Sequence, residues 1–280
     1  MKYRITSKKL GEKILAVHAG KSIYTGGTSR MLVNQDTGEV MCRCKKSVRS
    51  IASHGRYVCC GSYDCTAVLF HDGKVVDVIE GPDTEVKCVA FSEDGRYLAM
   101  ATRGRSVWVV KIDGEIEIDG VIEDHLHDVK GCIFHGGLLF TYGYDNTVKV
   151  YDRFDYDDSW ELVQSIDERS TVWCVIFHNG RMVCTTEEGT VSIYALRSGW
   201  TLEMSRKLSV LPIYSICSVG ENMAYVLNRS SIGIVDSNLN LVMSIENVHE
   251  DSINSIVYDE GRNRIVSGGD DGILNTIELL

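Results

Sequence analysis

Proline is nearly absent from this sequence, and long apolar runs are missing altogether. Only Pro82 and Pro212 occur among 280 residues. No window approaches the ~18 consecutive apolar residues that a membrane-spanning helix requires. The N-terminal residues also lack the apolar centre of a secretion signal. We therefore expect a soluble, intracellular protein that has no membrane among its partners.

An excess of positive charge is also missing. The formal net charge is −10 at pH 7, whereas a protein that neutralises nucleic-acid phosphates needs a basic surface. We therefore expect no nucleic acid among the partners.

Cysteine pairs with the spacing of common metal sites do not occur, although the chain has 10 cysteines. No C-x-x-C is present, and the nearest pairs are Cys42 with Cys44 and Cys59 with Cys60. Free thiols in a reducing compartment behave as small hydrophobic side chains. We expect these cysteines to lie in the core, with no disulfide, no metal and no cofactor.

Signatures of catalysis are missing too. There is no G-x-S-x-G motif and no histidine-rich metal-binding motif. The GGDDG segment at 268–272 is not followed by a predicted helix, so it does not predict a phosphate-binding loop. An acidic segment lacks the spacing of an EF-hand calcium loop; its acidic residues are Asp152, Asp155, Asp157 and Asp158. We therefore predict no catalytic residues.

What the sequence does contain is a repeated pattern. Each copy opens with an aliphatic residue and a short apolar strand, followed by a turn containing glycine, a second strand, a tight turn and a third strand. The first position of the pattern falls at Ile14, Val48, Val86, Val129, Val172, Ile213 and Ile253. Successive copies are 34 to 43 residues apart, close to the ~40–45 residues of a four-stranded propeller blade.

The local sequences favour strands throughout. Residues 86–91, 172–177 and 253–258 are short apolar runs rich in β-branched and aromatic side chains. Seven copies predict one all-β domain over residues 1–280, a seven-bladed β-propeller. Residues 2–5 are then expected to supply the outer strand of the last blade and to close the ring. Because the first and sixth copies are degenerate, six blades remain an alternative.

The fourth and seventh copies resemble the WD-repeat family. In that family a histidine, a serine or threonine, an aspartate and an aromatic residue form a polar network inside the blade. The matching residues are His125, Thr141, Asp145 and Tyr151 in the fourth copy and His249, Ser267 and Asp271 in the seventh. The resemblance implies that these residues are structural. Gly104 and Glu188 replace the turn aspartate in the third and fifth copies, and Trp-Asp occurs nowhere in the chain.

Three stretches resemble one branch of the family more closely. They are residues 127–166 together with 171–177, residues 98–110, and residues 249–275. The segment DYDDSWE is the most specific part. They are similar to the WD-repeat member of the cytosolic iron–sulfur protein assembly machinery. The resemblance implies a non-catalytic adaptor in the cytoplasm, and also in the nucleus. It implies as partners a MIP18-type protein, a HEAT-repeat targeting adaptor, an iron-only hydrogenase-like carrier and client apoproteins.

Three positions in each WD blade open onto one rim. Two of them matter here, namely the residue after the lead position and the residue before the turn aspartate. Tyrosine, tryptophan and arginine are frequent in interface hot spots, and a basic cluster on an acidic protein attracts acidic partners. The residues that we expect to bind partners are Arg49, Tyr63, Lys87, Arg103, Lys130, Tyr144, Trp173 and Tyr214. Arg103 also matches a binding arginine of the assembly family.

Two other functions stay open from the sequence. One is a WD-repeat scaffold in another pathway, such as substrate reception for a ubiquitin ligase or chromatin regulation. The other is a propeller enzyme, which would need converging carboxylates and histidines where the predicted rim offers mainly arginine, lysine and aromatic residues.

Overall fold

The chain folds into seven four-stranded antiparallel sheets. The computed structural model describes residues 2–154 and 159–280. Among these residues there are 28 strands, one short 3-10 turn and no α-helix. Seven sheets of this kind, following one another along the chain, are the blades of a seven-bladed β-propeller. The six-bladed alternative is therefore wrong.

The first four sheets follow the chain strand by strand. The first contains β2 (Ile14–Ala19), β3 (Ile23–Gly27), β4 (Met31–Asn34) and β5 (Val40–Arg43). The second contains β6 (Val48–His54), β7 (Tyr57–Ser62), β8 (Ala67–His71) and β9 (Lys74–Ile79). The third contains β10 (Val86–Phe91), β11 (Tyr97–Thr102), β12 (Val107–Lys111) and β13 (Glu117–Ile122). The fourth contains β14 (Val129–His135), β15 (Leu138–Gly143), β16 (Thr147–Phe154) and β17 (Ser159–Asp167).

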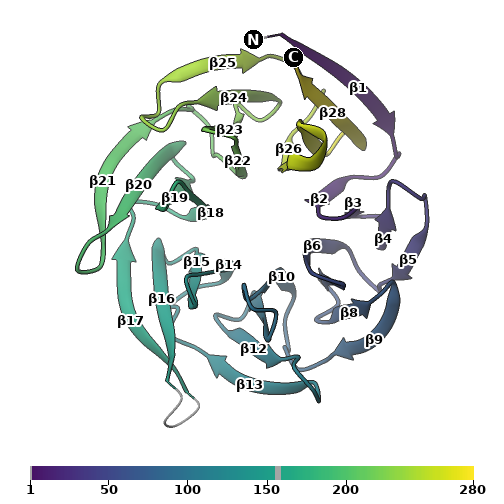
Figure 1. The fold of residues 1–280 in the computed structure, drawn as a ribbon, viewed down its shortest axis with the longest axis vertical. Coiled ribbons are helices and arrows are strands. Elements are labelled where there is room, and N and C mark those ends of the chain that lie inside the picture. Colours follow the sequence, from purple (N-terminus) through teal and green to yellow (C-terminus); the bar gives the residue numbers. More distant parts are fainter. Residues whose placement is uncertain (1, 155–158) are drawn as a thin grey trace. The chain divides into compact units, whose positions relative to one another are not determined.

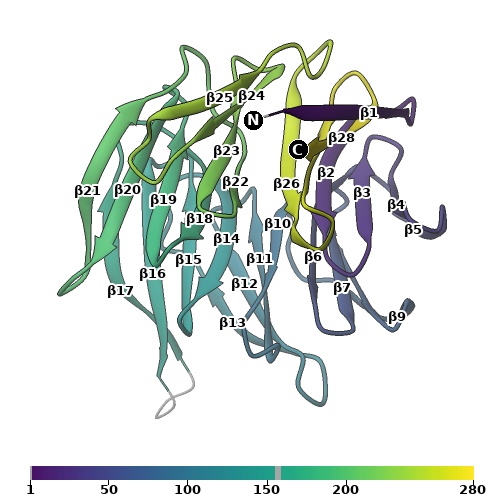
Figure 2. The ribbon, with the colours of Figure 1, turned by 45° about the horizontal axis from the view of Figure 1, so that its top comes forward.

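The last three sheets complete the series. The fifth contains β18 (Val172–His178), β19 (Arg181–Thr186), β20 (Thr190–Leu196) and β21 (Trp200–Lys207), which Figure 2 shows in succession. The sixth contains β22 (Ile216–Val219), β23 (Asn222–Leu227), β24 (Ser231–Val235) and β25 (Leu241–Ile245). The seventh contains β26 (Ile253–Asp259), the turn η1 (Glu260–Arg262), β27 (Arg264–Gly269), β28 (Ile273–Leu279) and β1 (Tyr3–Lys9).

The N-terminal strand completes the last sheet, as the sequence predicts. β1 pairs with β28 in antiparallel register from Tyr3 opposite Leu279 to Lys9 opposite Ile273, and the two strands lie side by side in Figure 1. The outer edge of β28 is therefore hydrogen-bonded by the other end of the chain.

Six of the seven predicted lead positions open a first strand, and the seventh does not. Ile213 lies three residues before β22 and is fully buried. Its backbone N–H donates to the carbonyl of Thr186 on another sheet. The residue before it is Pro212, which has no N–H to contribute to a strand ladder. Ile213 is therefore buried like the other lead residues, although the first strand of its sheet begins three residues later.

The chain forms two compact units. The first comprises residues 1–29, 33–39 and 173–280, and the second comprises residues 30–32 and 40–172. In the second unit, β6, β10 and β14 are neighbours and bury aliphatic side chains such as Val86, Val89 and Val129 between the sheets. In the first unit, β22, β26 and β2 do the same with Ile216, Ile256 and their neighbours. Burial of apolar surface between sheets is the main stabilising contribution in each unit.

Trp160 explains part of the most specific sequence segment. Its indole N–H donates to Asp119 at 2.8 Å, and Arg153 donates to the same carboxylate at 3.1 Å. The ring also packs edge-on against Tyr97 and Phe134. The third and fourth sheets are therefore joined by a polar contact as well as by apolar packing. Residues 155–158, which carry three of the acidic residues considered for calcium, lie outside the described residues.

Candidate protein-interaction site

A β-bulge occurs near the start of the first strand in the first, second, third, fourth and seventh sheets. In the third sheet the register shifts between Val86 and Cys88, which leaves Lys87 out of the ladder. The second and fourth sheets have the same shift around Arg49 and Lys130. A bulge bends the strand and redirects one side chain. The bulged residues are those that follow the lead positions. The bulge is therefore the local structure that takes these predicted contact residues out of the regular strand ladder.

The second predicted position in each blade is held next to the first strand. The backbone N–H groups of Tyr63, Arg103 and Tyr144 donate to carbonyls that directly precede the first strand of the same sheet. The acceptors are Ser47, Glu85 and Asp128, at 2.9, 3.0 and 3.0 Å. The two predicted positions of a blade are therefore neighbours in the structure of the second unit.

Lys87 lies between two tyrosine rings from the neighbouring sheets. Its Nζ is 5.9 Å from the ring centroid of Tyr63 and 5.9 Å from that of Tyr144. Both distances are within the range of cation–π attraction. Burial lowers the pKa of Lys87, and the nearby carboxylates of Asp128 and Glu85 offset only part of this effect. Six predicted residues form what we call the lysine–tyrosine site: Arg49, Tyr63, Lys87, Arg103, Lys130 and Tyr144.

Two carboxylates belong to the same surface, and the sequence reasoning missed them. Arg103 donates to Glu85 at 3.1 Å and lies 3.8 Å from a carboxylate oxygen of Asp128. The predicted basic cluster is therefore partly neutralised. A sequence signal existed, because Glu85 and Asp128 occupy the same repeat position, directly before Val86 and Val129. A site of this composition can bind an acidic segment only by competing with its own carboxylates.

The other unit holds the remaining predicted contact residues. Trp173 and Tyr214 pack edge to face, with ring centroids 4.8 Å apart and an interplanar angle of 88°. The indole N–H of Trp173 donates to Glu187 at 2.5 Å. Both rings are half-buried, which leaves part of each aromatic face available for contact.

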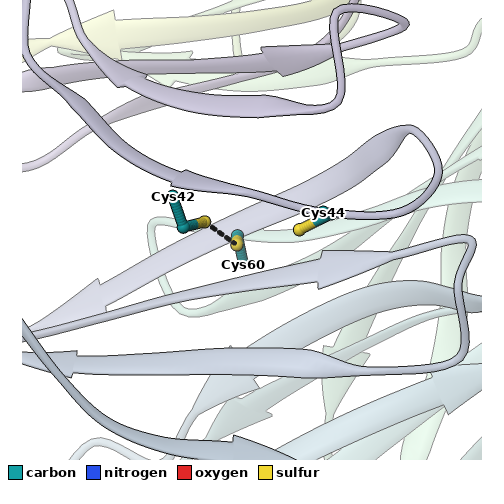
Figure 3. Close-up of side chains that lie close together, drawn as sticks. All are labelled: Cys42, Cys44 and Cys60. Carbon is teal, nitrogen blue, oxygen red and sulfur yellow. Dashed lines mark hydrogen bonds between the residues drawn. The ribbon is translucent and has the colours of Figure 1, made fainter.

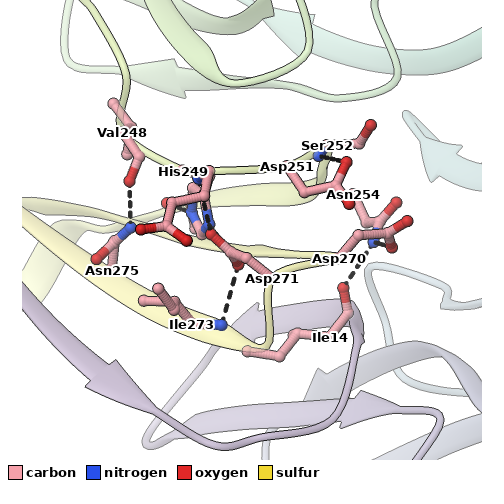
Figure 4. Close-up of polar contacts among 12 residues, drawn as sticks. Ile14, Val248, His249, Asp251, Ser252, Asn254, Asp270, Asp271, Ile273 and Asn275 are labelled. Atoms are coloured by element: carbon pink, nitrogen blue, oxygen red, sulfur yellow. Dashed lines mark hydrogen bonds and ion pairs between the residues drawn. The ribbon is translucent and has the colours of Figure 1, made fainter.

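A histidine–aspartate pair is buried in the fourth sheet and another in the seventh. His249 contacts Asp271 at 3.0 Å through Nδ1 (Figure 4). Its Nε2 lies 2.8 Å from the Ser267 hydroxyl. In the fourth sheet, His125 contacts Asp145 at 2.8 Å and Thr141 at 2.6 Å. The histidine and aspartate side chains are at most 5% exposed. Side chains as buried as these are not accessible to a substrate. Their hydrogen bonds instead hold the turns and the strand ends in place.

Tyr151 does not join the network, which corrects one part of the expectation. It is fully buried at the expected place, but its hydroxyl has no hydrogen-bond partner among the described residues. The Thr141 hydroxyl already pairs with His125. Tyr151 therefore contributes packing to the core between the third and fourth sheets rather than a hydrogen bond.

Three cysteines lie together, which the cysteine spacing in the sequence does not predict. Cys42, Cys44 and Cys60 place their sulfur atoms within 4.8 Å of one another (Figure 3). Cys42 lies on β5 of the first sheet and Cys44 directly follows that strand. Cys60 lies on β7 of the second sheet. Because spacing along the chain does not show which strands become neighbours, only the C-x-C pair is visible in the sequence.

Comparison with known proteins adds a family match. The family model described as "WD domain, G-beta repeat" matches residues 38–71, 73–110 and 240–275. The matches lie in the first three sheets and in the region of the sixth and seventh.

Relatives with curated names point to one pathway. "Probable cytosolic iron-sulfur protein assembly protein 1" of Vanderwaltozyma polyspora is 28% identical over 82% of this chain and 80% of its own length. The protein of the same name in Sclerotinia sclerotiorum is 26% identical over 70% of this chain and 46% of its own length. The "Probable cytosolic Fe-S cluster assembly factor" of Schizosaccharomyces japonicus is 30% identical over 78% and 42%. The chain thus spans under half the length of these last two relatives.

Among residues 2–154 and 159–280, no helix has the length and apolar character needed to span a bilayer.

Proposed function

We propose that this chain, a WD-repeat seven-bladed β-propeller similar to cytosolic iron–sulfur assembly proteins, is a non-catalytic adaptor in that assembly pathway. In this proposal residues 1–280 act as one domain that helps deliver 4Fe–4S clusters to apoproteins in the cytoplasm and nucleus. The similarity to relatives named for iron–sulfur assembly carries the proposal. The lysine–tyrosine site supports it, because aromatic rings around a cation suit protein recognition.

The proposed partners are those that the family resemblance implies. They are a MIP18-type protein, a HEAT-repeat targeting adaptor, an iron-only hydrogenase-like carrier and the client apoproteins. The exposed Arg103 and the half-buried Lys87 would receive an acidic segment of one of them, in place of Glu85 and Asp128. Trp173 and Tyr214 would supply a second, more apolar contact in the other unit.

Depletion of the protein in its host tests the function directly. We expect the activity of cytosolic iron–sulfur enzymes to fall several-fold, while mitochondrial iron–sulfur enzymes keep their activity. Restoring the wild-type chain should restore the cytosolic activity. Unchanged cytosolic enzymes after depletion would point instead to a scaffold in another pathway, such as ubiquitin ligation or chromatin regulation.

Arg103 offers a sharper test of where partners bind. We expect Arg103→Glu to reduce co-purification of the MIP18-type protein at least tenfold, because it adds a third carboxylate beside Glu85 and Asp128. The side chain is 59% exposed, so the unfolding temperature should change little.

Arg105→Glu is the matched control, since Arg105 is an exposed arginine of the same turn. If both variants captured the partner as well as the wild type, Arg103 would lose its assigned role.

A further inference from the structure

Three thiols converge at one place in the second unit. Cys42 lies on β5, Cys44 follows that strand by one residue, and Cys60 lies on β7. The Sγ atoms of Cys42 and Cys60 are 3.8 Å apart, and all three sulfur atoms lie within 4.8 Å of one another. Figure 3 shows Cys60 between the other two. Cys60 is fully buried and the other two are half-buried, so the group opens toward solvent on one side.

The chain geometry explains why these thiols meet. Side chains two residues apart on an extended segment point to the same face, so Cys42 and Cys44 project together. Cys59, which adjoins Cys60, belongs to a different buried cluster because alternate residues of β7 face opposite sides.

The sulfur spacing matches a single metal ion. A Zn–S bond is ~2.3 Å long, so thiolates sharing one zinc ion lie ~3.8–4.0 Å apart in tetrahedral or trigonal geometry. The Cys42–Cys60 sulfur separation of 3.8 Å has this value, and the other sulfur separations do not exceed 4.8 Å. A disulfide would need a sulfur separation of ~2.05 Å, and all three cysteines are free. Thiolates on different irons of a cluster stand further apart than thiolates on one ion, so the spacing favours a mononuclear site.

We propose that Cys42, Cys44 and Cys60 bind one thiophilic d10 metal ion, Zn²⁺ or Cu⁺, through their three sulfur atoms. Cu⁺ is satisfied by three thiolates, whereas Zn²⁺ takes a fourth ligand from the open side. This assignment does not depend on the proposed role in iron–sulfur assembly. It replaces the expectation that these three thiols are only core.

A cysteine binds a metal ion as its thiolate, so binding at this group would release thiol protons. The Cys42 and Cys60 thiols are hydrogen-bonded to each other, with their sulfur atoms 3.8 Å apart. Asp64 is close but is already hydrogen-bonded to Thr66 and to the backbone of Lys45, so it is not assigned as a ligand.

Metal titration of the purified full-length chain, kept reduced and free of oxygen, tests the proposal. In the first experiment, Co²⁺ serves as the optical probe for zinc binding. In the second, the protein competes with a chromogenic chelator for Cu⁺. We expect one ion per chain and, with Co²⁺, a strong near-ultraviolet thiolate-to-metal band that Zn²⁺ removes. Whichever of Zn²⁺ and Cu⁺ binds with the lower Kd is the ion that the site selects. Absence of one-to-one binding in both experiments would overturn the proposal.

Serine variants locate the ligands. Cys42→Ser and Cys44→Ser should each weaken binding at least 100-fold and abolish the thiolate band, whereas Cys65→Ser, a half-buried cysteine outside the group, should match the wild type. Cys44 lies just after β5, outside the strand ladder. The Cys44→Ser variant therefore tests the ligand assignment if Cys42→Ser does not fold. Unchanged binding in a folded Cys44→Ser variant would exclude the assigned site.

Discussion

Replacing Asp145 with alanine is expected to lower the free energy of unfolding by about 3 to 5 kcal/mol, because removing one partner of a buried polar pair leaves the other unsatisfied. Asp145 contacts His125 at 2.8 Å and accepts from the backbone N–H of Leu126 and from Thr147. The His125 side chain is 1% exposed and cannot recover these interactions from water. Urea unfolding measures the loss.

Two further variants separate the network from charge alone. Asp145→Asn keeps the shape but replaces one acceptor oxygen by a donor, so we expect an intermediate loss. Asp167→Ala removes an exposed carboxylate on β17 of the same sheet and should change stability by less than about 0.5 kcal/mol. Equal losses for Asp145→Ala and Asp167→Ala would mean that the network contributes nothing.

The Asp145 carboxylate should also make the free energy of unfolding depend on pH. Burial alone would raise the pKa of Asp145, but hydrogen bonds from His125 and Thr147 outweigh it and hold the pKa below its usual range. A lowered pKa in the folded state adds stability above the unfolded-state value of ~3.9, and this contribution is lost as the pH falls through the folded-state value. The stability difference between wild type and Asp145→Asn should therefore be largest above about pH 5 and shrink below about pH 4.

The fold could be predicted because its determinants are local and repeated. Each blade carries its own strand pattern and turns, and the missing outer strand of the last blade left one place for residues 2–5. Ile213 shows the limit of this reasoning. Its burial follows from the repeat, but the late start of β22 depends on the neighbouring proline and on a contact with another sheet.

The site could be predicted only as a set of positions. Repeat register identifies Lys87 as a rim residue, but its placement between two tyrosine rings depends on a bulge and on the neighbouring sheets. The same holds for Cys60, which meets Cys42 across two sheets. Contacts between side chains of different blades leave no spacing signal in the sequence. Contacts within a blade recur at similar offsets, as His125 with Asp145 and His249 with Asp271 show.

Lys87 is expected to contribute most to partner capture. Its ammonium group is half-buried between Tyr63 and Tyr144, so the rings fix its position before a partner arrives. A charge that is already ordered and partly desolvated interacts more strongly with an incoming carboxylate than a mobile surface lysine. We expect Lys87→Met to weaken capture of the MIP18-type protein about tenfold or more, since coupling energies measured for close charge pairs across an interface begin at ~1.5 kcal/mol.

Reversal of the charge should have a larger effect. Lys87→Glu places a carboxylate beside Glu85 and Asp128, and we expect capture to fall at least 100-fold in a binding titration. Lys74→Glu makes the same change of net charge at an exposed position on β9 and should leave binding unaltered. Raising the salt concentration should weaken wild-type binding more than that of Lys87→Met, because screening acts on the charge that methionine lacks. Binding by Lys87→Met that equals the wild type at every salt concentration would show that the lysine–tyrosine site recognises its partner by shape and aromatic contact, without the ammonium group.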